Sequence, residues 1–188
     1  MLSEELKLKT KQHHQQLEVK IIGAIKSIQH KNDYVQLLQL FAGFFGALEV
    51  SIDQIMDLKF LPDYALRRKA TALHSDLILL SASLPIKLES QNLPTIENSL
   101  QALGALYVME GSTLGGQVIA KMILNKLPEE KAFSFFKSYG EKTNEMWNFF
   151  KATIDAIDLT KDEMDIVIES ANETFHKFSL YVDFVNAD

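Results

Sequence analysis

The sequence predicts an all-α protein, and three observations support this prediction. Apolar residues recur at intervals of three and four along much of the chain, as at Leu17, Ile21 and Ile25, which is the spacing of one helix face. No segment shows the alternation of apolar and polar residues that is typical of a strand bounded by turns. The prolines fall between the periodic segments, where helices are expected to end.

Three helices are expected in the first half of the chain, over residues 3–27, 34–58 and 64–81. The first contains no proline, and a polar break at residues 30–33 separates it from a very apolar second helix. Pro62 stops the second helix, and the third follows directly.

Three further helices are expected over residues 95–127, 141–157 and 160–185. A polar connection that contains two prolines precedes the first of them, and Pro128 ends it. A short aromatic segment, residues 131–139, stops at a glycine before the next helix begins. Thr160 and Glu163 have the spacing of a capping box, which predicts the start of the final helix.

Length and composition favour one domain, residues 1–188, in a cytoplasmic protein. The 188 residues are 47% apolar and contain no internal repeat, which is enough for one well-buried core. There is no cysteine, so disulfides and thiolate metal sites are excluded. The N-terminus is too polar for a secretory signal and no apolar run approaches about 20 residues, so we expect no membrane association. The net charge of −6, with only two arginines, argues against nucleic-acid binding.

A glycine-containing segment of the fourth helix, residues 103–121, is a candidate ligand-binding element. Gly104, Gly111 and Gly115 fall at i, i+7 and i+11 and therefore share one helix face, with Gly116 beside it. A glycine costs a helix interior about 1 kcal/mol relative to alanine, so four of them need a reason. Two explanations are open at this point: close packing of another helix, or close approach of a flat ligand.

The first helix carries the candidate metal ligand. Lys7, His14 and Glu18 have the same i, i+7, i+11 spacing, and a carboxylate one turn from an imidazole can orient the ring for metal binding. Lys7 lies two turns from His14, about 10 Å along a straight helix. His13 is the competing ligand, but Leu17, one turn after it, cannot orient the ring. The alternative for these residues is an ordinary solvated helix face.

Taken together, the two helices fit a planar metal-containing ligand held between them. One helix would offer an oriented histidine and a basic residue. The other would offer a bare glycine face that lets the backbone approach the ligand and leaves room for a small gas molecule.

On these residues the sequence resembles the haem oxygenase family, and the resemblance runs along the whole chain. LSEELKLKTKQHHQQLE, residues 2–18, resembles the family's proximal helix. The resemblance implies that His14 is the axial ligand of the iron, that Glu18 is its supporting carboxylate, and that Lys7 binds a haem propionate.

The distal side of the family's haem site is also recognisable. GSTLGGQ, residues 111–117, resembles the distal signature in the EGSTLGG form of bacterial, bacteriophytochrome-associated members. The resemblance implies that Gly111, Ser112, Gly115 and Gly116 form the catalytic side of the haem.

Nearer the C-terminus, Lys151 and Phe175 match a second propionate-binding basic residue and a phenylalanine of the haem pocket. Three positions depart from the common pattern. Leu106 stands where a tyrosine often helps to hold a propionate, with Tyr107 adjacent. Ser112 stands where many members have an aspartate that organises water, so we expect proton delivery to depend on Ser112, backbone groups and ordered water. Lys151 stands where arginine is common, and it offers a point charge instead of a bidentate fork.

The resemblance implies a helical bundle with haem between a proximal and a glycine-rich distal helix. It also implies oxidative ring-opening of haem to biliverdin with release of iron and carbon monoxide, haem being both cofactor and substrate. Dioxygen is the co-substrate. Because no GxGxxG motif occurs, electrons are expected from an external reductase or ferredoxin. The resemblance alone leads us to expect a monomer.

Two other interpretations remain open. The first is a haem-binding sensor or carrier on the same fold, in which Ser112 supports binding without turnover. The second is a non-haem di-iron oxidase, which needs carboxylates and histidines from several helices. Glu173 and His176 form a single Glu-x-x-His motif where a ferritin-type site uses two, so this interpretation is the less favoured.

Overall fold

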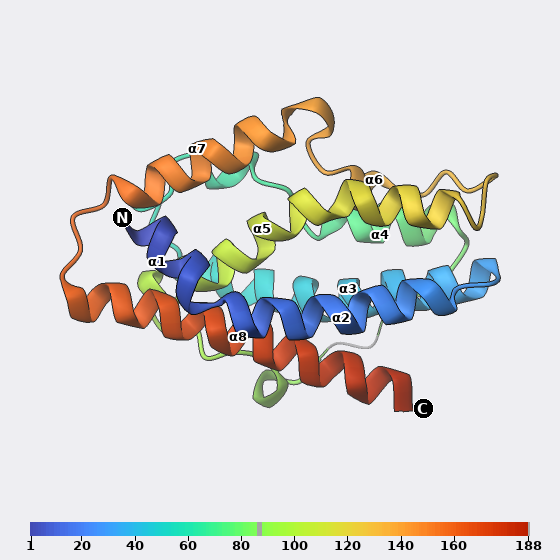
Figure 1. Cartoon of the computed structure of the whole chain (residues 1–188), viewed down its shortest axis with the longest axis horizontal. Coiled ribbons are helices and arrows are strands. Elements are labelled where there is room, and N and C mark those ends of the chain that lie inside the picture. Colours follow the sequence, from blue (N-terminus) through green and yellow to red (C-terminus); the bar gives the residue numbers. More distant parts are fainter. Residues whose placement is uncertain (86–87, 188) are drawn as a thin grey trace.

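The computed structural model describes residues 1–85 and 88–187, and every regular element in these ranges is helical (Figure 1). The predicted all-α fold is therefore confirmed. In chain order the α-helices are α1 (Leu2–Lys9), α2 (Lys11–Ser27), α3 (Lys31–Ile55), α4 (Thr71–Leu79), α5 (Ser99–Leu124), α6 (Ser134–Lys137), α7 (Thr143–Asp155) and α8 (Lys161–Ala187). Short 3-10 helices lie at Tyr64–Leu66, Ser90–Asn92 and Gly140–Lys142.

Helix α5 is central to the fold, and it changes direction near its middle (Figure 1). Its first half packs closely on α8. Gly104 lies against the Val167 carbonyl, and a Cβ atom added to Gly104 would come within 2.9 Å of the Ala171 amide nitrogen. Its second half packs on α6, where Gly116 lies against the Phe136 carbonyl. Two of the four glycines are thus required for close helix packing.

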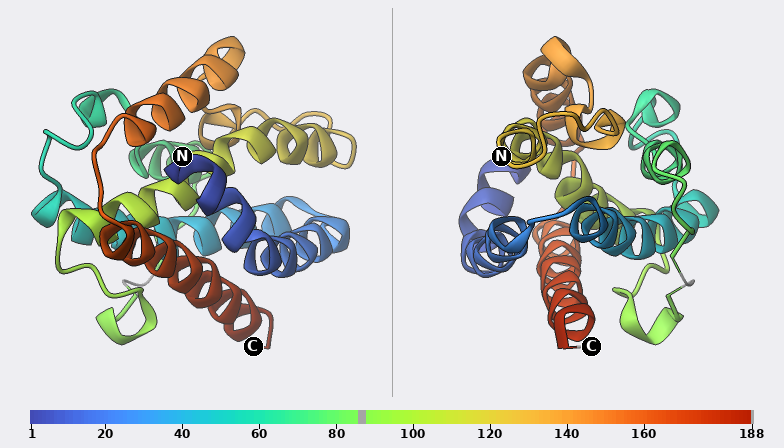
Figure 2. Two further views of the ribbon diagram at one scale, coloured as in Figure 1. Left: turned by 60° about the vertical axis from the view of Figure 1, so that its left-hand side comes forward. Right: turned by 90° about the vertical axis from the view of Figure 1, so that its right-hand side faces the viewer.

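The remaining helices surround this centre. Seen end-on, α2 lies on one side of the molecule and α4 on the other, with α3 between them (Figure 2). α8 packs against α2, α3 and α5. This arrangement leaves α2 running below the second half of α5 on one face (Figure 1).

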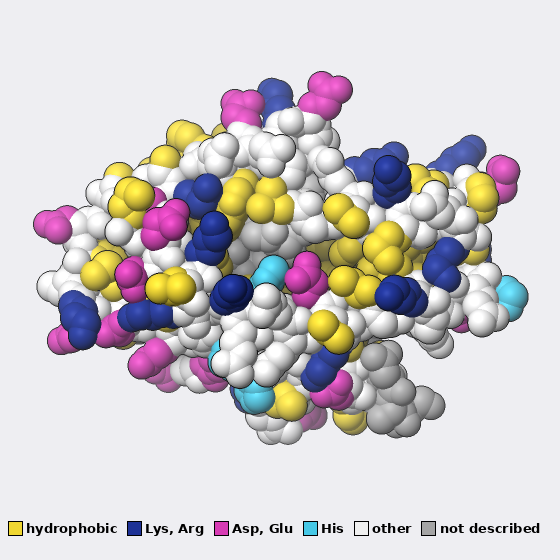
Figure 3. All heavy atoms as spheres, in the orientation of Figure 1, with side chains coloured by type: hydrophobic (Ala, Val, Ile, Leu, Met, Phe, Trp, Pro, Cys, Tyr) yellow, Lys and Arg dark blue, Asp and Glu magenta, His cyan; other side chains and the backbone are white. Residues whose placement is uncertain are grey.

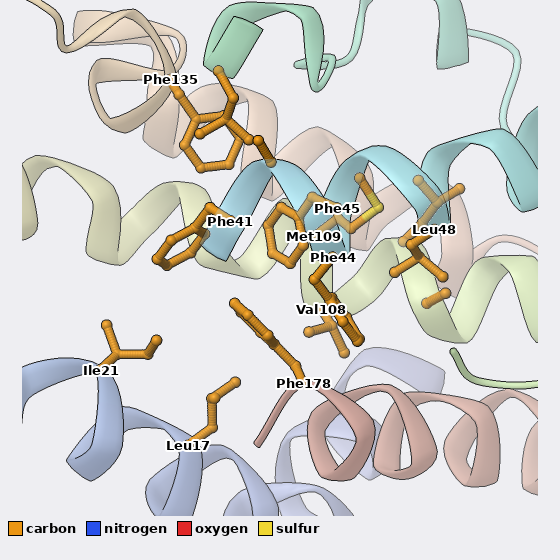
Figure 4. Close-up of a cluster of buried hydrophobic side chains, with 14 of the residues drawn as sticks. Leu17, Ile21, Phe41, Phe44, Phe45, Leu48, Val108, Met109, Phe135 and Phe178 are labelled. Carbon is orange, nitrogen blue, oxygen red and sulfur yellow. The ribbon is translucent and has the colours of Figure 1, made fainter. Parts of the chain in front are cut away.

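Aromatic side chains of α3 and α8 form the densest part of the core (Figure 4). Phe44 stacks on Phe178 with ring centroids 4.6 Å apart, and Phe41 and Phe45 each lie 5.3 Å from the same ring. The cluster also receives side chains from α2, α5 and α6, namely Leu17, Ile21, Val108, Met109 and Phe135. Burial of each large apolar side chain contributes about 1.5–3 kcal/mol, so this cluster fixes α2 against the body of the protein.

Helix α3 is long and apolar enough, by length and composition alone, to cross a membrane. The prediction that no segment approaches this criterion was wrong for this helix. However, 61% of its apolar window is buried inside the protein, which is the pattern of a core helix.

The predicted first helix, residues 3–27, is divided in two at Thr10. The Thr10 hydroxyl donates to the Leu6 carbonyl at 2.7 Å, and hydrogen bonds of this kind bend helices. Ser3, at the start of α1, donates from its amide and hydroxyl to the Asp155 carboxylate at 2.8 and 2.6 Å. These bonds tie α1 to α7, so α1 leaves the axis of α2.

The predicted third helix, residues 64–81, is also interrupted. A 3-10 helix at Tyr64–Leu66 is followed by extended backbone at Arg67, with ψ 151°, and only Thr71–Leu79 is α-helical. The cause is tertiary: the side chains of Arg67 and Arg68 reach into hydrogen bonds with α5, which a continuous helix would not provide.

The ends of two other helices depend on capping. The Asn98 side chain accepts hydrogen bonds from the amides of Leu100 and Gln101, so α5 begins later than the predicted residue 95. The predicted capping box of α8 is confirmed: the Thr160 amide donates to the Glu163 carboxylate at 2.8 Å, and the Glu163 amide donates to the Thr160 hydroxyl at 3.3 Å.

Candidate functional site

A hollow crosses one face of the molecule between α2 and the second half of α5. Figure 3 shows it in the orientation of Figure 1, with apolar side chains on its walls. A histidine and an acidic side chain border it on the side of α2, and basic side chains surround it. The hollow is therefore the candidate site at which the two predicted helices face a common ligand.

His14 is an inward-facing residue that is nevertheless exposed. It precedes the buried residues Leu17 and Ile21 by three and seven positions, which places it on the same face of α2. Its ring lies edge-on against the buried Phe175 of α8, with centroids 5.4 Å apart. The imidazole on this face is therefore exposed, and Phe175 supports it from the side.

His13 has a different environment. Its Nδ1 lies 2.8 Å from the Asn172 Oδ1, and its ring centroid lies 6.2 Å from that of His176. Both partners belong to α8, so this contact joins α2 to α8. Of the two adjacent histidines, only His13 has a ring nitrogen in a hydrogen bond within the described ranges, and both ring nitrogens of His14 are without one there.

The other two residues predicted on the first helix are both exposed. Glu18 follows His14 by one turn of α2, but no hydrogen bond between them is present in the described part of the chain. Lys7 lies on α1, beyond the break at Thr10. The separation of about 10 Å along one straight helix therefore does not apply to Lys7 and His14.

Helix α5 presents an open apolar face around Gly115. A Cβ added to Gly115 would meet no atom within 4 Å, and one added to Gly111 would meet only the Trp147 ring, at 3.7 Å. Leu114 and Val118, one turn apart, are 38% and 61% exposed. An apolar helix face of this kind suits a flat apolar ligand.

The four glycines therefore do not form the single face that their spacing predicts. Gly115 borders open space and Gly111 lies beside the Trp147 ring, whereas Gly104 and Gly116 lie in helix packing contacts. Of the glycines expected at the ligand, Gly116 is buried against the carbonyl of Phe136. Close helix packing thus explains Gly104 and Gly116 and does not explain Gly111 and Gly115.

Ser112 is held from within the protein. Its hydroxyl donates to the Met109 carbonyl at 2.6 Å and accepts a hydrogen bond from the Arg68 Nη2 at 2.7 Å. The hydroxyl hydrogen is thus engaged, and one lone pair of the oxygen remains. In this arrangement Ser112 can accept a hydrogen bond from water but has no free hydrogen to donate.

A buried ion-pair network lies directly beside this segment. Arg67 Nη1 donates to Glu110 Oε2 at 3.0 Å, and Arg67 Nη2 lies 2.6 Å from Asp63 Oδ2. The Tyr139 hydroxyl donates to Glu110 at 2.9 Å and accepts from the Arg68 amide at 2.6 Å. Burial raises the pKa of Glu110, an effect that the positive charge of Arg67 opposes. Burial disfavours the charged form of Arg68 as well and lowers its pKa to about 10, so Arg68 is still protonated at neutral pH.

Sequence reasoning assigned no role in the site to either arginine or to Trp147. These are the only arginines and the only tryptophan of the chain, and this rarity was the available signal. Trp147 lies beside Gly111, and Lys151 Nζ lies 5.8 Å from the Trp147 ring centroid. Lys151 of α7 thus lies near Trp147, the residue that packs beside Gly111.

Other parts of the described chain offer no competing centre. A depression of about 610 Å³ at the far end of α5 is lined by none of the predicted site residues. Within the described ranges, no group of three or more His, Cys, Asp or Glu side chains could hold a metal ion, so nothing there supports a di-iron site.

The residues around the hollow fit a planar ligand with a central metal and acidic edges. An exposed imidazole on α2 can bind the metal, and the open face at Gly111 and Gly115 can lie against the plane of the ligand. The ammonium groups of Lys7 and Lys151 are available for carboxylates at the edge, since neither is engaged in an ion pair within the described residues.

Comparison with known proteins identifies a matching family. The model of the family described as "Heme oxygenase" matches residues 1–183. The chain is 24% identical over 185 residues to heme oxygenase PigA of Pseudomonas aeruginosa, a match that covers 94% of this chain and 88% of that protein.

The fold is shared with solved structures. A heme oxygenase from Neisseria meningitidis, solved with NO and CO bound, aligns with a TM-score of 0.84 at 22% identity and covers 100% of this chain and 92% of its own. Heme oxygenase-1 from the cyanobacterium Synechocystis, in complex with heme, aligns with a TM-score of 0.78 at 16% identity, covering 99% and 92%. At these identities the structural likeness establishes the fold alone.

Proposed function

The chain belongs to the haem oxygenase family, and from this premise we propose that it opens the haem ring oxidatively to biliverdin, releasing iron and carbon monoxide. The observation that supports the proposal is that His14 is exposed although it lies on the same face of α2 as the buried Leu17 and Ile21, while α5 is open at Gly115. An oxidoreductase of this kind uses haem as both cofactor and substrate.

The proximal residues of this chain bind and orient the group. Haem supplies the iron that activates dioxygen and the ring that is oxidised. His14 offers a ring nitrogen to the iron, and the edge contact with Phe175 restricts rotation of the imidazole. Glu18, one turn along α2, can accept a hydrogen bond from the second ring nitrogen through a water molecule. Lys7 and Lys151 would pair with the propionates.

The distal residues limit where the ring can react. Gly111 and Gly115 allow the α5 backbone to approach the ring, while Leu114 and Val118 restrict access along its edge. The free lone pair of Ser112 can orient a water molecule that carries the proton needed at the distal side. The open face at Gly115 would leave room for dioxygen, and an external reductase or ferredoxin would supply the electrons.

We also propose that the chain acts as a single domain, residues 1–188, and as a monomer in the cytoplasm. The family match over residues 1–183 supports the domain assignment. Sedimentation of the haem complex tests the monomer.

The test is an anaerobic haem titration followed by air and a reductant, comparing wild type with His14→Ala and His13→Gln. Wild type should bind haem one-to-one with a histidine-ligated spectrum and convert it to biliverdin. His14→Ala should lose that spectrum and the turnover. His13→Gln removes the neighbouring imidazole and keeps a hydrogen-bond donor for Asn172. This variant should retain both the histidine-ligated spectrum and the turnover.

The main alternative is a haem-binding sensor or carrier. Wild-type protein that binds haem through His14 and returns it intact in the presence of reductant and dioxygen would favour the carrier. Absence of haem binding would reject both functions.

A further inference from the structure

Arg68 is a cation held by neutral acceptors. Among the ion pairs of residues 1–85 and 88–187, Arg67 takes the two nearby carboxylates, Asp63 and Glu110, and none includes Arg68. The Arg68 guanidinium instead donates to the Met109 carbonyl at 2.7 Å, to the Ser112 hydroxyl at 2.7 Å and to a third acceptor at 3.2 Å. Two of these three hydrogen bonds are directed at α5, and a simple charge pair does not account for the position of Arg68.

Arg68 is also held by contacts with residues outside α5. Its guanidinium carbon lies 3.9 Å from the Phe135 ring centroid, and its second terminal nitrogen bonds Ser138. Its backbone amide donates to the Tyr139 hydroxyl, which itself donates to Glu110. Three elements, the loop before α4, the α6 region and α5, thus meet at this side chain.

The segment that Arg68 contacts needs such a restraint. Ser112 follows Gly111 and precedes Gly115 and Gly116, and α5 changes direction in this region (Figure 1). Glycines give a helix more backbone freedom than other residues. Two hydrogen bonds from one rigid guanidinium to a carbonyl and to a side chain three residues later fix the turn at this point.

We propose that Arg68 is a positioning residue for the distal side of the site, acting through Ser112 and the Met109 carbonyl. It holds the glycine-containing turn of α5 so that one edge of the bound ring is presented for oxidation. The consequence for the product rests on the proposed function, whereas the restraint on α5 exists without any ligand.

The test uses Arg68→Gln, Arg68→Lys, Ser112→Ala and the double variant Arg68→Gln/Ser112→Ala. The control is Lys69→Gln, which removes the next cation of the same loop, a residue paired with Glu49 and Asp53. Hydrogen exchange of the α5 amides 110–116 is measured in the haem-free proteins. The ratio of biliverdin isomers is then measured after turnover.

In haem-free Arg68→Gln, exchange of amides 110–116 should be about tenfold faster than in wild type, with the amides of α3 unchanged. Arg68→Lys keeps the positive charge but lacks the planar guanidinium group. It should show a smaller increase in exchange rate and confirm that folding is intact. Lys69→Gln should match wild type. Equal protection of α5 in Arg68→Gln and wild type would overturn the proposal, whether or not the protein acts on haem.

The ratio of biliverdin isomers distinguishes a positioning role from general destabilisation. Loss of positioning changes the isomer ratio, whereas general destabilisation lowers the amount of product and leaves the ratio unchanged. Arg68→Gln and Ser112→Ala should each broaden the isomer mixture, and the double variant should broaden it no further than the larger single change. Additive effects would show that Arg68 does not act through Ser112. If wild type makes no biliverdin, the proposed function fails, and the exchange experiment still decides the role of Arg68.

Discussion

At the scale of single residues, Glu110 shows how a charge can be retained inside this fold. It is 2% exposed, bonds Arg67 and Tyr139, and lies one residue before the glycine turn of α5. Burial raises its pKa, so the folded state binds this proton more tightly than the unfolded chain does. The stability that this carboxyl contributes is therefore fully present below its unfolded pKa of about 4.5 and is lost as pH rises through the higher folded value.

The raised pKa of Glu110 predicts that the protein tolerates loss of the charge of this residue. Loss of the whole side chain should not be tolerated. Glu110→Gln imitates the protonated carboxyl and keeps an acceptor for both partners, so the free energy of unfolding at pH 7 should change by no more than about 1 kcal/mol. Glu110→Ala leaves buried donors unpaired and should cost about 3–5 kcal/mol. Relative to wild type, Glu110→Gln should also become more stable as pH rises from 5 to 8.

Urea unfolding at several pH values checks this prediction. A loss of several kcal/mol in Glu110→Gln at pH 7 would mean that the ionised form is strongly favoured in the folded protein, contrary to the direction of the pKa shift.

At the scale of elements, the two kinds of glycine in α5 predict opposite effects of the same substitution. A Cβ at position 104 would collide with α8, so Gly104→Ala should lower the free energy of unfolding by about 1–3 kcal/mol. A Cβ at Gly115 meets open space, so Gly115→Ala should raise the stability of the haem-free protein by about 0.5–1 kcal/mol. The same methyl group would stand in the hollow and should weaken haem binding.

Thermal unfolding and haem titration of both variants test this contrast. A stabilised Gly115→Ala protein that binds haem like wild type would show that the ligand does not lie against this face. An unaltered Gly104→Ala protein would contradict the packing role of Gly104.

The same elements show which parts of the fold a sequence can predict. Helix type and the start of α8 follow from local signals, the apolar period and the Thr160–Glu163 capping box, and both were predicted correctly. The break between Leu66 and Thr71 was missed because Arg67 pairs with Glu110, 43 residues away, and no local pattern encodes that contact. The division of the glycines likewise depends on where α8 and α6 pass, which periodicity along α5 does not contain.

At the scale of the whole molecule, one face of α2 contributes both to the core and to the candidate site. Leu17 and Ile21 join the aromatic core, and His13 and Lys20 bond to α8, the latter through Ser179 and Asp183. The same helix carries His14 at the edge of the core, where the packing against α5 is incomplete. A ligand in the hollow would therefore join α2 to α5 and add to the stability of the entire fold.

This arrangement predicts a large, His14-dependent increase in thermal stability on haem binding. At free haem of 100 times the dissociation constant, linkage adds about 2.7 kcal/mol to the free energy of unfolding. For a chain of this length that corresponds to a rise in Tm of about 5–10 °C. At the same haem concentration His14→Ala should show a much smaller rise, because its affinity is reduced, while His13→Gln should match wild type. An equal rise in all three proteins would mean that haem binds through apolar contacts alone, and that the exposed imidazole of α2 is not its anchor.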